Sequence, residues 1–135
     1  MNGSDPCPFC NPASRVVDSN ARAFAIRDAF PVTPGHTLII SKRHCPDFFQ
    51  LTPAETADCF ELVKSQRRHL IQTLKPDGFN IGVNVGEAAG QSVFQVHIHV
   101  IPQFKGDHPR PRGGIRNVLL WTGHGARRTG DPPQG

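Results

Sequence analysis

The 135-residue chain contains no tyrosine, one tryptophan and one methionine. It also lacks any apolar run near the ~20 residues that a helix needs to cross a bilayer, so the sequence excludes a transmembrane helix. Its first residues carry neither a basic end nor an apolar stretch, and we therefore expect no secretory signal and a cytoplasmic location. With 37% hydrophobic and 19% charged residues, the composition predicts a single soluble globular domain.

The net charge of +4 lies at the carboxyl-terminal end. Residues 1–104 contain nine Lys and Arg against nine Asp and Glu, whereas residues 105–135 contain six against two. Residues 105–116 hold four of these cations, which favours either a solvated loop or binding of the outer phosphates of a polyphosphate. Nucleic-acid binding is the weakest alternative, because neither an aromatic stacking platform nor a basic recognition helix accompanies the charge.

The pattern of elements predicts an α+β domain with a mainly antiparallel sheet of about five strands and one long helix. Thr52, Pro53 and Glu55 mark the helix start, because they combine a cap, a first-turn proline and a capping-box glutamate. We expect this single domain to fill residues 1–118 and residues 119–135 to form a largely disordered tail. The expected strands are residues 15–17, 23–26, 37–41, 79–85 and 94–101, and the expected buried helix stripe is Cys59, Leu62, Val63, Gln66, Leu70 and Leu74.

In residues 95–101 the three polar side chains alternate with aliphatic ones. A strand would send the aliphatic ones into the core and project Gln95, His97 and His99 from the opposite face. This pattern is typical both of a half-buried strand with a polar outer face and of a site lined by imidazoles. The preceding loop is needed to choose between these two interpretations.

That loop, residues 84–92, is rich in glycine, Asn, Gln and Ser. Glycine lets backbone N–H groups approach an anion, and the neutral side chains can bond phosphate oxygens. A phosphate held there would lie beside the imidazoles, and a neutral imidazole is a competent nucleophile at phosphorus. The residues therefore predict a phosphoester or phosphoanhydride site with a histidine nucleophile and no metal required for catalysis.

The run from Gly90 to Pro102 resembles the signature of the histidine triad (HIT) superfamily of nucleotide hydrolases and transferases, His-φ-His-φ-His-φ-φ with φ apolar. The amino-terminal Cys-x-x-Cys is similar to that of a bacterial branch. Gln95 stands where the motif has its first His, while His97 matches the nucleophile. The likeness covers roughly residues 7–118 and includes residues 25–28, 34–40, 42–44 and 84–91.

The resemblance implies a HIT-like fold, a homodimer and a dinucleoside polyphosphate hydrolase or nucleoside phosphoramidase acting at the α-phosphorus of an adenine nucleotide. His97 would form a covalent nucleotidyl intermediate, His99 would orient the phosphate and Ser92 would assist the leaving group. Gln95 cannot take up a proton, so a nucleotide-binding module with weak or no catalysis is the alternative. The nucleotide-binding residues that the resemblance implies are Asp28 at the ribose, Asn84, Gly90 and Gln91 at the phosphates, and Phe24 and Ile26, with Phe9, at the base.

Cys7 and Cys10 form a Cys-x-x-Cys pair that suits either redox chemistry or zinc. Redox pairs follow a strand and begin a helix, and neither flank fits here. The resemblance implies a structural zinc ion held by Cys7, Cys10 and His44, with Gln95 at the fourth corner, where an amide is a poor ligand. The alternative is a pair of reduced thiols that pack the amino-terminal segment.

Overall fold

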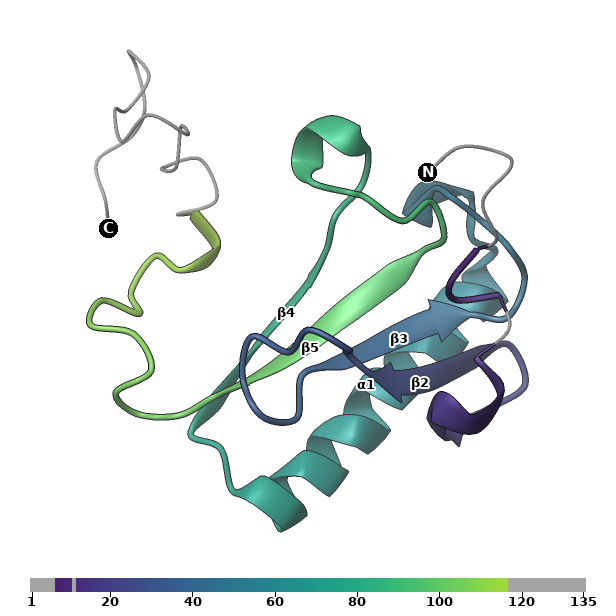
Figure 1. Cartoon of the computed structure of the whole chain (residues 1–135). Coiled ribbons are helices and arrows are strands. Elements are labelled where there is room, and N and C mark those ends of the chain that lie inside the picture. Colours follow the sequence, from purple (N-terminus) through teal and green to yellow (C-terminus); the bar gives the residue numbers. More distant parts are fainter. Residues whose placement is uncertain (1–6, 11, 117–135) are drawn as a thin grey trace. The chain divides into compact units, whose positions relative to one another are not determined.

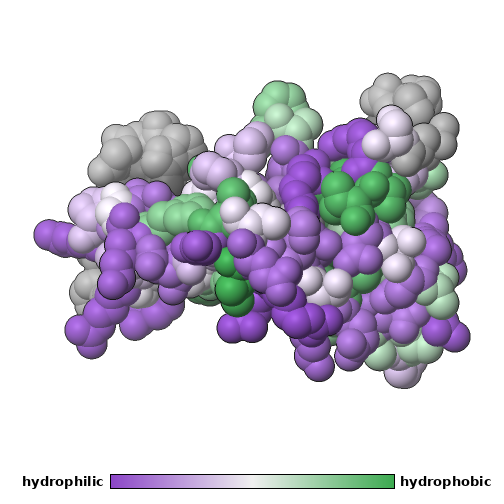
Figure 2. Space-filling view, turned by 90° about the horizontal axis from the view of Figure 1, so that it is seen from below, coloured by the Kyte–Doolittle hydropathy of each residue, from purple (hydrophilic) through white to green (hydrophobic). Residues whose placement is uncertain are grey.

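The computed structural model describes residues 7–10 and 12–116 of the chain. The chain divides into two compact units, residues 1–103 and residues 104–135. The predicted boundary after residue 118 and the predicted tail, residues 119–135, lie outside the described residues. Among the described residues no helix is long and apolar enough to cross a membrane, and the face seen in Figure 2 is mainly hydrophilic, with its apolar surface in separate patches.

The first unit is a five-stranded antiparallel sheet with a long helix against one face (Figure 1). This confirms the predicted α+β class. The strand order is β1-β2-β3-β5-β4, so β5 lies between two partners while β1 and β4 form the edges. The elements are η1 (Ala13–Arg15), β1 (Val16–Ser19), β2 (Ala23–Arg27), β3 (Thr37–Ser41), η2 (Phe48–Gln50), α1 (Pro53–Leu74), β4 (Gly78–Val83), η3 (Glu87–Ala89) and β5 (His97–Gln103).

The last strand differs from its predicted bounds, since it begins at His97 and not at residue 94. The cause lies just before it, where the Val96 N–H donates to the Cys45 carbonyl at 2.8 Å, in the loop that follows β3. The strand also continues through Pro102 to Gln103. Proline is tolerated at residue 102 because the pairing with β3 ends at Val100. From residue 101 onward β5 pairs with β4 alone, so it has a neighbouring strand on one side only.

Helix α1 begins at the predicted residues. The Thr52 hydroxyl accepts from the Glu55 N–H, and the Glu55 carboxylate accepts from the Thr52 N–H, which completes a capping box. It ends at Leu74, where Lys75 turns left-handed with φ 52°. The prediction for Leu74 was wrong: it is the last helical residue and stays 40% exposed. The other predicted stripe residues are buried, namely Cys59, Leu62, Val63, Gln66 and Leu70.

Apolar side chains are buried on both faces of the sheet. On the helix side, the core joins α1 to side chains of β2, β3 and β5 such as Ala25, Ile39 and Ile98. On the other side there is a second, smaller cluster that α1 does not reach. This second cluster consists of Phe9, Phe24, Ile26, Leu38 and Ile40.

Gly35 makes the turn into β3, and we expect Gly35→Ala to lower the free energy of unfolding by about 2 kcal/mol. Its φ is +88°, and an added Cβ would lie 2.7 Å from Leu74 Cδ1 and 3.2 Å from Pro102 Cγ. Urea denaturation measures the effect. Gly82→Ala is the control, because a Cβ there meets no atom within 4 Å, and equal losses in both variants would contradict this explanation.

Candidate functional site

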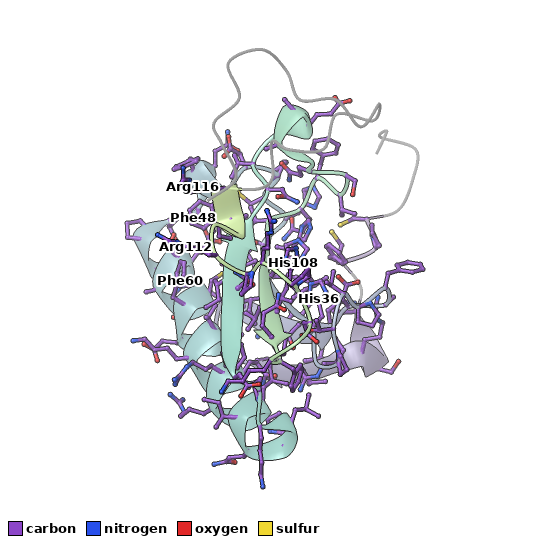
Figure 3. The ribbon with its side chains drawn as sticks, turned by 90° about the vertical axis from the view of Figure 1, so that its left-hand side faces the viewer. His36, Phe48, Phe60, His108, Arg112 and Arg116 are labelled. Atoms are coloured by element: carbon purple, nitrogen blue, oxygen red, sulfur yellow. The ribbon has the colours of Figure 1, made fainter. Side chains whose placement is uncertain are left out.

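The two histidines of β5 lie on the sheet face opposite α1. His97 is paired with Ile40 and His99 with Leu38, and both of these partners belong to the second apolar cluster. Figure 3 shows the same division, with His36 on one side of the sheet and Phe60 of α1 on the other. The alternation of residues 97–100 therefore sorts imidazoles to one face and core residues to the other.

His97 is held in one tautomer by the backbone. Its Nδ1 lies 2.8 Å from the Gln95 carbonyl oxygen, and because a carbonyl only accepts, Nδ1 carries the proton and Nε2 keeps its lone pair. The ring is 8% exposed and lies edge-on to Phe9, with centroids 5.1 Å apart. The arrangement presents an oriented nitrogen nucleophile with an apolar wall on one side.

His36, just before β3, belongs to the site although no sequence pattern predicted a role for it. The Val32 N–H donates to its Nδ1 at 3.1 Å, so the neutral ring carries its proton on Nε2. This Nε2–H donates to His99 Nδ1 at 2.9 Å, which leaves the His99 proton on its own Nε2. The signal in the sequence is position: His36 lies two residues before Leu38, the strand partner of His99.

Asp28 lies beside this pair of imidazoles. One carboxylate oxygen accepts from the Phe30 N–H at 2.9 Å, and the other lies 3.4 Å from His36 Nε2. Asp28, His36 and His99 bring their ligand atoms within 4.8 Å of one another. Because His36 Nε2 carries a proton here, we interpret this trio as an ordered hydrogen-bond chain and not as a metal site.

Burial keeps both imidazoles of this hydrogen-bond chain, His36 and His99, neutral. Burial, and then the neighbouring His97 and His36, lower the pKa of His99 to about 4. Burial likewise lowers the pKa of His36, against the opposing effect of Asp28. A neutral His99 offers an N–H donor without placing a positive charge beside His97.

We expect the NMR signals of His99 to titrate with a midpoint near pH 4, against the ordinary value of 6.5. The unfolded chain takes up this proton at a higher pH than the folded one, so the free energy of unfolding should fall as pH drops from 6.5 towards 4. Nitrogen-15 spectra of the imidazoles measure the midpoint and tautomer, with the urea-unfolded chain as control. A midpoint near 6.5, or a proton on His99 Nδ1, would contradict the hydrogen bonds that link Asp28, His36 and His99.

The loop after β4 has the glycine geometry expected of a backbone that approaches an anion. Gly86 and Gly90 flank η3 with φ of 90° and 95°. Asn84 lies beside Gly90, since its Nδ2 would be 3.7 Å from a Cβ placed there. Ser92 is exposed. A hollow of about 660 Å³ opens along this loop, lined by Glu87, Gly90, Gln91, Ser92 and Phe94.

Gln91, expected at the phosphates, has its side chain turned into the loop. Its amide oxygen accepts from the Gly86 N–H at 2.8 Å, and its amide nitrogen donates to the Pro46 and Val93 carbonyls. Only 5% of the residue is exposed. The side chain therefore holds the loop in shape and ties it to the segment after β3.

Gln95 also departs from its expected place on the outer face. It is 1% exposed, and its amide oxygen accepts from the Cys45 N–H at 2.6 Å. Its amide nitrogen lies within 3.1 Å of three oxygens, the Ser41 carbonyl and hydroxyl and the Arg43 carbonyl. The side chain is thus a buried clamp on the loop after β3, while its own carbonyl orients His97.

The residues expected at the base belong to the second apolar cluster. Phe24 is 5% exposed and Ile26 is fully buried, and both pack in the cluster that includes Phe9. Phe9 contacts His97 as well. The amino-terminal segment therefore covers part of the face on which the imidazoles lie.

The three metal-ligand candidates converge, as the family resemblance implied. Cys7, Cys10 and His44 bring one ligand atom each within 4.8 Å of one another, and Cys10 Sγ lies 3.1 Å from His44 Nδ1. Thiolate and imidazole are the donors that zinc prefers. The set fits a zinc ion with three of the four usual ligands.

Residues 11–106 match the family described as HIT domain, and the chain therefore belongs to this family. An uncharacterized HIT-like protein of Mycoplasma genitalium is 38% identical over 109 residues, 77% of this chain and 77% of that protein. An AP-4-A phosphorylase of Mycobacterium tuberculosis is 31% identical over 93 residues, 68% of this chain and 48% of that protein.

Solved structures agree with the family assignment and confirm the expected HIT-like fold. A zinc-bound histidine triad family protein of Mycobacterium smegmatis has a TM-score of 0.70 at 32% identity, covering 86% of this chain and 92% of that one. A hypothetical histidine triad nucleotide-binding protein of Sulfolobus tokodaii has a TM-score of 0.70 at 32% identity, covering 77% of this chain and 73% of that one.

Proposed function

We propose that this HIT domain protein is a nucleotide hydrolase or nucleotidyl transferase that cleaves dinucleoside polyphosphates or nucleoside phosphoramidates at the α-phosphorus. The observation that carries the proposal is the orientation of His97, whose Nδ1 is bonded to a carbonyl so that Nε2 is free to attack. The related AP-4-A phosphorylase and histidine triad nucleotide-binding protein support the substrate class.

The reaction has two steps. His97 Nε2 attacks the α-phosphorus, a P–N bond forms, and the bond to the leaving phosphate or amine breaks. The leaving group takes a proton from water or from the Ser92 hydroxyl, and the neutral His99 stays protonated on Nε2 and donates a hydrogen bond to a phosphoryl oxygen. Water then attacks the same phosphorus and gives its proton to solvent, or back to Ser92 where the serine had donated one. The P–N bond breaks, and nucleoside monophosphate leaves with His97 neutral again.

The other side chains bind the nucleotide. We place the ribose hydroxyls at Asp28, which adjoins the hydrogen-bonded pair His36 and His99, and the base at the edge of the second apolar cluster, where Phe24 and Ile26 support it from within. The phosphates lie against the loop that carries Asn84, Gly90 and Ser92. Gln91 acts there indirectly, because its amide holds the loop.

Turnover of diadenosine tetraphosphate and of adenosine phosphoramidate, with adenosine monophosphate release measured by chromatography, tests the proposal. The second candidate is a nucleotide-binding module, motivated by an amide at residue 95 that cannot carry a proton. That candidate predicts adenosine monophosphate binding without turnover, and a gain of activity in Gln95→His. Rapid turnover by the natural protein would end the second candidate, and no turnover of either substrate would end the first.

We also propose a homodimer in which two sheets join at an edge. β4 is an edge strand of the sheet, and its Ile81 is 42% exposed, so a partner strand there would cover apolar surface. Sedimentation at micromolar concentration, with Ile81→Arg as the disrupting variant, tests this. The dimer is refuted if the natural protein and Ile81→Arg both sediment with the mass of a monomer.

A structural zinc ion and a cytoplasmic location complete the proposal. The Cys7, Cys10 and His44 cluster and the zinc-bound relative support the metal, and all four cysteines are free thiols, as in a reducing compartment. Catalysis itself uses no cofactor. The remaining alternative is nucleic-acid binding by residues 105–135, which predicts a salt-dependent affinity for nucleic acid that is lost when these residues are removed. An unchanged affinity after their removal would exclude it.

A further inference from the structure

The metal-ligand cluster is complete except for its fourth donor. Cys7, Cys10 and His44 supply two thiolates and one imidazole within 4.8 Å. A closed zinc site has four protein donors, whereas three donors and an exchangeable fourth position define an open one. The question is therefore which group, if any, of this chain can reach the fourth position.

Gln95 is the residue expected at that corner, and its amide is engaged elsewhere. The only atom it could offer a metal is its carbonyl oxygen, which accepts from the buried Cys45 N–H at 2.6 Å. Turning that oxygen towards the metal would leave this N–H unpaired and break the bonds from the amide nitrogen to Ser41 and Arg43. Leaving buried polar groups without hydrogen-bond partners is costly. The Gln95 side chain therefore keeps these bonds and does not reach the metal.

Cys45 is the other candidate, because it follows His44 directly. Its thiol is 1% exposed and donates to the Asp47 carbonyl at 3.2 Å. It does not belong to the group of donors that converge within 4.8 Å, and among the described residues no further His, Cys, Asp or Glu joins that group.

The cluster is also open to solvent, since Cys10 and His44 are exposed and Cys7 is half-buried. We propose that a zinc-class ion held by Cys7, Cys10 and His44 keeps its fourth coordination position open to a small exogenous donor such as water, imidazole or a thiolate. Binding is a ligand substitution: the incoming donor forms one bond to the metal, the bound water leaves, and no electrons are transferred. The inference is independent of the proposed nucleotide chemistry.

Cobalt(II) reports on the site without any measurement of turnover. The full chain, stripped of metal and kept reduced with a phosphine in place of a thiol, should bind one Co²⁺ with visible bands typical of tetrahedral thiolate coordination. Added imidazole should then shift these bands saturably, with one imidazole per metal. Unchanged bands at saturating imidazole, or no Co²⁺ binding, would overturn the proposal.

Variants identify the donors. Cys10→Ser should weaken Co²⁺ binding by about tenfold or more, while Cys59→Ala, which removes a buried thiol on α1, should leave it unchanged. Gln95→Ala loosens the loop that carries His44, so it should bind Co²⁺ more weakly, yet keep the cobalt bands and the imidazole shift of the natural chain. Different cobalt bands in a folded Gln95→Ala protein before imidazole is added would make Gln95 a ligand and overturn the proposal, and the imidazole experiment on the natural chain decides the matter if this variant does not fold.

Discussion

His97→Ala is expected to reduce turnover of diadenosine tetraphosphate by about 10³-fold or more, because the variant has no nitrogen to attack phosphorus. The backbone bond that orients the ring makes this loss specific to residue 97: the Gln95 carbonyl holds Nδ1 and directs Nε2 outward. Neighbouring His99 cannot substitute, since its Nδ1 accepts from His36 and only a protonated nitrogen remains. Steady-state kinetics under saturating substrate measure the effect.

His69→Ala is the matched control, because it removes an exposed imidazole from α1. It should retain full activity. Adenosine monophosphate should still bind to His97→Ala, since the proposed ribose and base contacts do not involve residue 97. Equal turnover by His97→Ala and the natural protein would remove His97 from the mechanism and with it the proposed intermediate.

Gln95→Ala is expected to lower the free energy of unfolding by about 3 kcal/mol. The side chain is 1% exposed, and its loss leaves the Cys45 N–H and the oxygens of Ser41 and Arg43 without this partner in a buried place. A small cavity adds to the cost. Chemical denaturation monitored by circular dichroism measures the change.

Gln103→Ala provides the comparison on the same strand. This glutamine is only half-buried, and its side chain donates to Asn80 at 2.9 Å. We expect a loss below about 1 kcal/mol. Equal losses at the two positions would show that Gln95 is an ordinary strand residue and that the loop after β3 does not depend on it.

Local patterns in the sequence were enough to predict the elements of the fold. The start of α1 follows from Thr52, Pro53 and Glu55, whose contacts are all within one turn. β3 was predicted at its observed bounds, 37–41, since apolar β-branched residues lie between two breaks in the chain. Leu74 was misplaced because burial at a helix end depends on where the sheet ends, which no local pattern records.

The arrangement of the site depended on contacts between distant segments, and much of it could not be predicted. The alternation of residues 95–101 predicted that Gln95 would face outward with His97. In the structure the strand begins only at His97. The Gln95 amide is hydrogen-bonded to residues 41–45, about fifty positions earlier. His36 likewise acquires its place from a bond to His99, 63 residues away.

Direct detection of the intermediate tests the central claim, that His97 Nε2 becomes covalently bonded to the α-phosphorus. The protein would be mixed with labelled diadenosine tetraphosphate, quenched in alkali, in which a phosphohistidine-type bond survives, and digested for mass spectrometry. We predict one adenylyl group on the peptide that contains His97, formed at a rate at least equal to turnover and absent in His97→Ala. Turnover with no adenylylated peptide, or with the label on another residue, would contradict the account.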